Sequence, residues 1–246
     1  MRPILFVWHG FVLHSYHVMI YAALLVTVFL AVHLAQADGL DPDRTALAIV
    51  LSFVPAFVGA RLFYVARHWE HFRRDPARIL RRSEGGLALH GGFFGIVAGS
   101  IPLLWALDLP FAPFMDALVL GMLGGIAVAK AGCLLNGCCY GLPTDHWCGV
   151  NLPDHCGVWR RRFPSQLVEM AWAAFVLLLM LAWRSASPPS GAVACAVFVL
   201  QPAGRIFLQK LRDEGDDENA AVQKTSAVLV TAALLAGLCV WLWGGK

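Results

Sequence analysis

Long apolar runs dominate the chain, and shorter polar stretches separate them. A helix needs about 20 apolar residues to cross a hydrocarbon core of roughly 30 Å. Each such run must be helical, because lipid offers no partners for unpaired backbone groups. The runs cover residues 16–36, 45–66, 91–107, 113–135, 166–183, 191–209 and 225–243. The pattern therefore predicts an all-α integral membrane protein of about seven transmembrane helices.

The connections between these runs differ in length. Residues 67–90, 136–164 and 210–224 form long polar loops, whereas the other connections are short. The long loops follow every second run, so they lie on one side of the membrane, and we expect a headgroup-level active site on that side. Residues 1–15 precede the first run and are expected to form an interfacial segment at the membrane surface. We interpret residues 1–246 as a single membrane domain.

Composition agrees with a membrane protein and excludes one class of partner. Hydrophobic residues make up 59% of the chain and charged residues only 14%, whereas soluble domains carry about 25% charged residues. The net charge is a mild +3. No basic helix or RNA-binding signature is present, so we expect no nucleic-acid partner.

Positive side chains are distributed unevenly over the two sides of the predicted bundle. Most of them flank the long loops, and the other side has Arg44, Arg184 and Lys246. The positive-inside rule would place the long loops in the cytoplasm. A site that binds an anion is another reason for basic loops, and the resemblance described below favours that reason.

Three cations, Arg61, Lys130 and Arg205, lie within or at the ends of apolar runs. Each could extend its charged end to the membrane surface. Ionisable groups at membrane depth more often face a cavity or a partner, and all three are on one side. This favours a shared anion site, for which a phospholipid phosphate is the obvious ligand.

Polar residues also open the fifth run. Ser165 is a candidate N-cap for that helix, and Gln166 and Glu169 follow it. If Gln166 and Glu169 are buried they need partners, for which the cations above are candidates.

His90 stands at the start of the third run, between Gly85–Gly86 and Gly91–Gly92. Glycines permit close backbone approach, and histidine suits proton transfer near neutral pH. A purely structural histidine is the alternative.

Five cysteines fall within one segment: Cys133, Cys138, Cys139, Cys148 and Cys156. Their spacing matches no standard zinc motif, so no metal is assigned. A disulfide between Cys148 and Cys156 is favoured if the loop faces an oxidising compartment. Cys138, with Cys139 beside it, is alternatively a nucleophile that carries an acyl or glyceryl group.

Six blocks, in order, resemble the prolipoprotein diacylglyceryl transferase family along nearly the whole chain. The block LHGG matches the family's HGG motif, and GCLLNGCCYGLPT is similar to its signature GNFxNxExxGxPT. The blocks are Ser15–Met19, Gly59–Tyr64, Leu89–Gly92, Gly132–Thr144, Phe163–Glu169 and Gly204–Asp213. The resemblance implies a multi-pass protein of the bacterial inner membrane whose long loops face the periplasm.

The chain also departs from the family pattern at four positions. Lys130 stands for an arginine, Cys133 for an asparagine, Cys138 for a glutamate and Gln209 for a second glutamate. Lysine keeps the positive charge but loses bidentate phosphate geometry. A divergent branch that uses a different acceptor, either a small molecule or a lipid, is therefore an alternative.

The family's reaction moves the diacylglyceryl group of phosphatidylglycerol to a cysteine thiol of a lipoprotein precursor, without a cofactor. On the matching positions, we expect His90 to transfer a proton, and Lys130 and Arg205 to stabilise the leaving phosphate. Expected substrate contacts are Tyr16, Arg61, Asn136, Gly141, Gln166, Glu169 and Arg212. A non-catalytic lipid-binding or redox protein that uses the cysteines is the alternative from another class.

Overall fold

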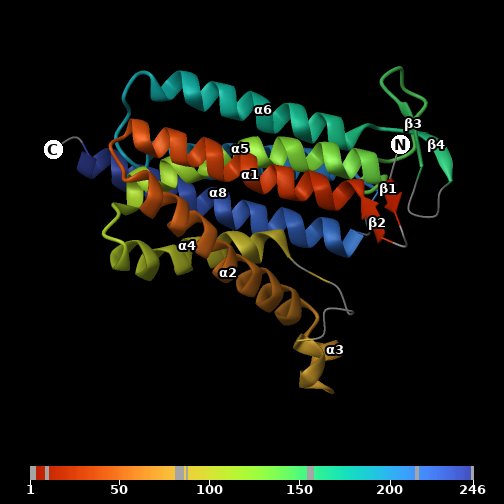
Figure 1. Ribbon diagram of the computed structural model, residues 1–246. Coiled ribbons are helices and arrows are strands. Elements are labelled where there is room, and N and C mark those ends of the chain that lie inside the picture. The colour runs from red at the N-terminus through yellow and green to blue at the C-terminus, as the bar shows by residue number, and fades with distance from the viewer. Residues whose placement is uncertain are drawn as a thin grey trace. The chain divides into compact units, whose positions relative to one another are not determined.

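The computed structural model describes residues 4–8, 11–80, 86, 88–153, 158–213 and 216–244, and this part is mostly helical (Figure 1). The helices are α1 (Ser15–Ala37), α2 (Pro42–Arg67), α3 (Trp69–Phe72), η1 (Pro76–Leu80), α4 (Leu89–Ala106), α5 (Phe111–Asn136), α6 (Ser165–Arg184), α7 (Ala192–Gln209) and α8 (Asp216–Gly244). Two antiparallel hairpins pair β1 (Ile4–Trp8) with β2 (Phe11–His14), and β3 (Val150–Pro153) with β4 (Trp159–Arg162).

These helices confirm the predicted helical membrane fold, whereas the two short hairpins were not predicted. Within the described residues, α1, α2, α5, α6 and α7 are long and apolar enough to cross a membrane. The other two predicted spans correspond to shorter apolar stretches, Gly91–Ala106 in α4 and Val222–Leu235 in α8. Helix α8 begins earlier than expected, at Asp216, within the segment predicted as a loop. The reason is that this segment is rich in Glu, Ala, Gln and Lys, which favour helix.

The chain forms two compact units. Unit 1 comprises Met1–Leu34 and Met115–Lys246, and unit 2 comprises Ala35–Phe114. The interpretation of residues 1–246 as a single membrane domain stays a prediction.

In unit 2, helices α2 and α4 pack closely through small residues. A Cβ atom at Gly95 of α4 would overlap the carbonyl oxygen of Pro55 in α2, and it would lie 3.2 Å from the Cα of Ala56. A Cβ at Gly59 would lie 2.8 Å from the Cα of Gly95. Small residues let helix backbones approach each other in this way, which is the main route to tight packing between apolar helices.

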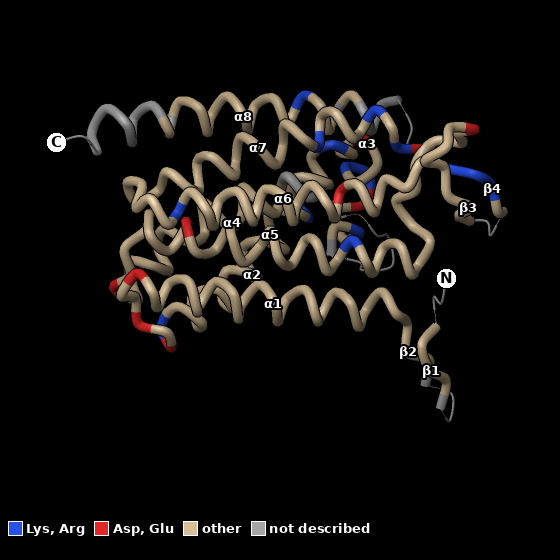
Figure 2. The backbone as a smooth tube through the Cα atoms, turned by 90° about the horizontal axis from the view of Figure 1, so that it is seen from above, with Lys and Arg blue, Asp and Glu red and all other residues tan. Residues whose placement is uncertain are grey.

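In unit 1, a buried carboxylate fixes the start of α7. Asp116 of α5 accepts hydrogen bonds from the backbone N–H groups of Gly191, at 2.6 Å, and Ala194, at 2.7 Å. A negative charge is favourable there, because the N-terminus of a helix carries a partial positive charge. Figure 2 shows that α1 and most of α8 carry no charged residue between their ends.

Both hairpins belong to unit 1 and lie at the same end of its helices (Figures 1 and 2). In β1, four successive apolar residues are exposed, from Ile4 to Val7. The described part of residues 1–15 forms a β-hairpin followed by the start of α1. That this segment lies at the membrane surface stays a prediction.

The close approach of α2 and α4 can be tested with one added methyl group. Gly95→Ala is expected to lower the free energy of unfolding by about 1–3 kcal/mol, because the backbone must shift. Gly92→Ala, on the same helix, is the matched control, since its Cβ would come no closer than 3.6 Å to Ala56. Denaturant titration of the two variants in detergent measures the difference. Equal stability would contradict the packing described here.

Candidate functional site

The segment that follows α5 forms a backbone ladder with two other segments of unit 1. Gly141 N–H donates to the Phe163 carbonyl at 3.1 Å, and Leu142 N–H donates to the Leu211 carbonyl at 3.0 Å. A Cβ at Gly141 would lie 2.8 Å from the Leu211 oxygen, so only glycine fits without a shift. The ladder brings the end of α5, the start of α6 and the end of α7 together. Gly141 thus has a structural role at the site.

Glu169, in the second turn of α6, is surrounded by three cations. Its Oε2 atom lies 2.5 Å from Lys130 Nζ of α5 and 2.7 Å from Arg205 Nη1 of α7. Its Oε1 atom lies 3.2 Å from Nη1 of Arg212, just after α7. The pairing of Glu169 with cations was predicted from the sequence. It joins four of the predicted site residues in one cluster, which we call the Glu169 cluster.

The four residues of the Glu169 cluster carry three positive charges and one negative charge. Three positive groups surround one carboxylate, and the side chains of Lys130 and Arg205 are 15% and 21% exposed. Buried charges cost several kcal/mol each unless they are compensated. An arrangement with excess, partly accessible positive charge therefore favours a bound anion, and phosphate is well suited to cationic hydrogen-bond donors.

Arg61 lies in unit 2, where its guanidinium binds backbone carbonyls. Nε donates to Ile79 at 2.9 Å, and Nη1 donates to Gly86 at 3.1 Å. The guanidinium also lies 5.4 Å from the ring centroid of Phe72. These contacts tie α2 to α3, η1 and Gly86, so they give Arg61 a structural role. Its predicted contact with substrate stays a prediction.

A second ion pair in unit 1 was missed by sequence reasoning. Arg162 of β4 is buried, its Nη1 lies 2.7 Å from Asp213 Oδ2, and its guanidinium lies 4.5 Å from the ring centroid of Tyr140. The run of three arginines before the fifth apolar run was the available signal, but it did not show which arginine is buried.

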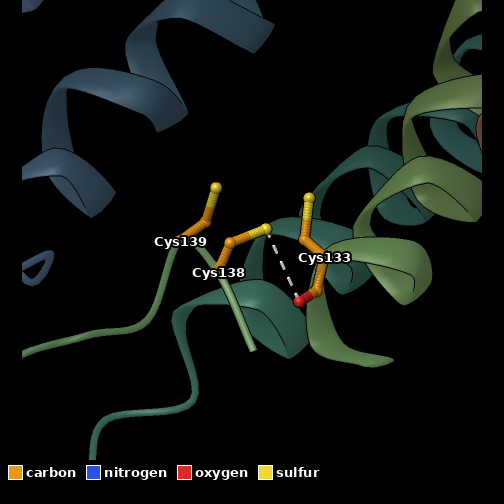
Figure 3. Close-up of side chains that lie close together, drawn as sticks. All are labelled: Cys133, Cys138 and Cys139. Atoms are coloured by element: carbon orange, nitrogen blue, oxygen red, sulfur yellow. Dashed lines mark hydrogen bonds between the residues drawn. The ribbon is translucent and has the colours of Figure 1, made fainter. Parts of the chain in front are cut away.

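Three thiols gather beside the Glu169 cluster. The Sγ atoms of Cys133, Cys138 and Cys139 all lie within 4.8 Å of one another (Figure 3). Hydrogen bonds from Cys133 and Cys138 lower the pKa of the Cys139 thiol below its usual range, and the positive charges of Arg212 and Lys130 lower it further. A thiol with a lowered pKa is more readily ionised, and the thiolate is the form that acts as nucleophile or metal ligand.

Two side chains at the start of α6 hold this thiol segment. Gln166 Nε2 donates to the Cys138 carbonyl at 2.8 Å, and Ser165 Oγ donates to the Cys139 carbonyl at 2.7 Å. Ser165 is therefore not the N-cap predicted from the sequence. It is the first residue of α6, and its hydroxyl makes a contact distant in sequence. Gln166 binds a carbonyl rather than a cation, because the backbone ladder brings that carbonyl within reach.

The remaining predicted residues are only partly described. Tyr16 lies within electrostatic range of the three thiols, and the exposed Asn136 hydrogen-bonds Cys138. Cys148 is a free thiol whose Sγ lies 3.2 Å from His146 Nδ1. Cys156 lies outside the described residues, as does the side chain of His90, whose backbone is in the first turn of α4 in unit 2.

An apolar groove of about 650 Å³ runs between α6 and α7. Its lining includes Val168 and Gly204, which are the sequence neighbours of Glu169 and Arg205. Trp172 and Phe175 on α6, and Phe207 on α7, continue the lining. The groove therefore has the apolar character that an acyl chain requires.

Removal of the central carboxylate tests whether the Glu169 cluster stabilises the fold. Glu169→Gln is expected to lower the free energy of unfolding by about 3–5 kcal/mol, because buried cations lose their partner. The control is Glu70→Gln, whose carboxylate is 2.6 Å from Arg73 but 77% exposed, so little change is expected. Denaturant titration in detergent compares the two, and a neutral Glu169→Gln would show that the cations do not depend on the carboxylate.

Residues 3–243 match the family described as prolipoprotein diacylglyceryl transferase. The chain is 29% identical to the phosphatidylglycerol–prolipoprotein diacylglyceryl transferase of Synechococcus sp. strain CC9902, over 99% of this chain and 94% of that protein. It is 31% identical to the protein of that name from Parasynechococcus marenigrum, over 85% of this chain and 80% of that protein. It is 28% identical to the protein of that name from Bacillus cytotoxicus, over 83% of this chain and 78% of that protein. This chain is thus a multi-pass membrane protein that belongs to the prolipoprotein diacylglyceryl transferase family.

Proposed function

We propose that this protein transfers the diacylglyceryl group of phosphatidylglycerol to the cysteine thiol of a lipoprotein precursor. The observation that carries the proposal is the convergence of Lys130, Arg205 and Arg212 on the single carboxylate of Glu169. Family membership supports the same reaction. The protein would act in the bacterial cytoplasmic membrane, with its site on the periplasmic side.

The donor lipid has two parts that the site can accommodate. Its phosphate is an anion, and the Glu169 cluster has more positive than negative charge. Its acyl chains are apolar, and the groove between α6 and α7 has an apolar lining that includes Val168 and Gly204, the sequence neighbours of Glu169 and Arg205. A phospholipid bound in this way would have its phosphate at the cations and its acyl chains in the groove, with the glyceryl carbon between them.

In the reaction, the acceptor sulfur attacks the glyceryl carbon bonded to the phosphate oxygen. The S–C bond forms and the C–O bond breaks, and its electron pair leaves with glycerol phosphate. Lys130 and Arg205 stabilise the negative charge on that phosphate. Arg212 shares the carboxylate with them and keeps it in position. His90, assigned from the family's HGG motif, accepts the thiol proton.

A second candidate keeps the donor lipid but changes the acceptor to a small molecule or another lipid. The observation that favours it is the replacement of the family's signature glutamate by Cys138. The two candidates differ in the product on which the diacylglyceryl group is found.

The reaction can be tested with purified protein, labelled phosphatidylglycerol and a peptide that contains a lipobox cysteine. Mass spectrometry is expected to find the thioether peptide together with glycerol phosphate. Arg205→Ala is expected to lower the transfer rate about 100-fold or more, since one of the positive side chains that stabilise the leaving phosphate is lost. Arg160→Ala, an exposed arginine of β4, is the control and should keep the wild-type rate.

Each outcome of this assay distinguishes between the candidates. Glycerol phosphate released without a modified peptide would favour the second acceptor class. An Arg205→Ala protein that is folded, as judged by its thermal transition, and fully active would refute the assigned phosphate contact. The same assay on His90→Gln tests the proton-transfer assignment, for which a wild-type rate would be the contrary result.

A further inference from the structure

The three neighbouring thiols of unit 1 are not needed for the reaction as described above. Cys133 is in the last turns of α5, and Cys138 and Cys139 follow that helix. All three are free cysteines in the structure. Figure 3 shows their sulfur atoms close together, with that of Cys138 between the other two in this view. Two of them, Cys133 and Cys138, stand where the chain departs from the family signature.

A backbone turn, rather than side-chain packing, brings the first two thiols together. Helix α5 ends in a Schellman motif, in which Gly137 has φ 74°. Gly137 N–H donates to the Leu134 carbonyl at 3.3 Å, and Cys138 N–H donates to the Cys133 carbonyl at 3.1 Å. In this motif the side chains at the Cys133 and Cys138 positions normally make an apolar contact. Here both positions carry a thiol.

The third thiol is held in place by a strained residue and by α6. Cys139 has φ 60°, a left-handed conformation that costs a non-glycine residue roughly 1–2 kcal/mol. Ser165 and Gln166, both fully buried, bind the carbonyls of Cys139 and Cys138. Strain that surrounding contacts maintain is typical of functional sites. The thiol positions are therefore set in advance by the fold.

The geometry suits a thiophilic metal ion. Zn–S bonds of about 2.3 Å place the sulfur atoms of a tetrahedral site about 3.8 Å apart. The three Sγ atoms already lie within 4.8 Å, so small side-chain rotations would close the site. Thiolates select ions of this class over Mg²⁺ and Ca²⁺. Three thiolates and one divalent ion carry a net negative charge, and the nearby Lys130 and Arg212 compensate it.

We propose that Cys133, Cys138 and Cys139 bind Zn²⁺ and leave its fourth position open for the thiol of the acceptor. Three protein ligands with one open position are the pattern of a catalytic rather than a structural zinc site. This inference rests on the proposed function, because it assigns the site a role in the same thiol alkylation. It departs from the expectation that no metal is used.

The chemistry balances without any change of oxidation state. The acceptor thiol displaces a water molecule from the ion, and its proton leaves to solvent. The bound sulfur then attacks the glyceryl carbon, and the S–C bond forms as the C–O bond to phosphate breaks. The thioether product is a weaker ligand than a thiolate, so it leaves and water returns to the ion.

The test uses the full chain, purified in detergent under reducing conditions. Elemental analysis is expected to find one zinc ion per chain, and titration with Co²⁺ is expected to give the absorption of thiolate-to-cobalt charge transfer. Each of the variants Cys133→Ser, Cys138→Ser and Cys139→Ser is expected to weaken zinc binding at least about 100-fold. Loss of a residue that only supports a metal ligand already costs up to about 100-fold, and these variants lose a ligand itself. Cys195→Ser, which removes a partly buried free cysteine of α7, is the matched control.

Binding and transfer are measured on the same samples, so that failures can be separated. Wild-type protein that binds no zinc, or a Cys133→Ser variant that binds it as tightly as wild type, overturns the metal site and leaves the proposed function standing. Cysteine variants that lose zinc but transfer at the wild-type rate overturn its role in thiol activation. Zinc binding without any diacylglyceryl transfer refutes the proposed function and, with it, that role. Loss of transfer after chelation, restored by Zn²⁺, supports the inference.

Discussion

A single buried carboxylate holds together the part of the molecule where the proposed chemistry takes place. Glu169 pairs with Lys130, Arg205 and Arg212, and so joins α6 to α5, to α7 and to the segment after α7. An unpaired charge is far more costly in apolar surroundings than in water. These elements therefore stay together, and the same interaction gathers the excess positive charge that an anionic lipid requires.

Main-chain hydrogen bonds place the chemical groups around that carboxylate. The ladder at Gly141 and Leu142 fixes the start of α6 against the end of α7, and the first residues of α6 bind the carbonyls of the thiol segment. The positions of the cations and of the thiols thus depend on one set of backbone contacts. A change in that set would alter the anion site and the thiols together.

The apolar runs predicted the long helices to within a few residues, except for the start of α8, because lipid leaves no alternative to helix. The pairing of Glu169 with Lys130 and Arg205 was predictable for a related reason, since charges in apolar segments need partners. The clustering of Cys133 with Cys138 and Cys139 was not predicted. Known metal motifs are recognised by the number of residues between ligands, whereas here a left-handed turn at the end of α5 determines which side chains are in contact. The partners of Arg61 also escaped prediction, since backbone carbonyls of a loop leave no mark in the sequence.

The turn at Gly137 has an evolutionary consequence. Because main-chain bonds bring positions 133 and 138 together, any two side chains placed there will be neighbours. A few point mutations could replace the asparagine and the glutamate of the family signature by two cysteines at these positions, with helix α5 and its end unchanged. The end of this helix is thus a natural place for new reactivity to arise, and grafting the sulfur-bearing residues into a relative would be a direct way to engineer it.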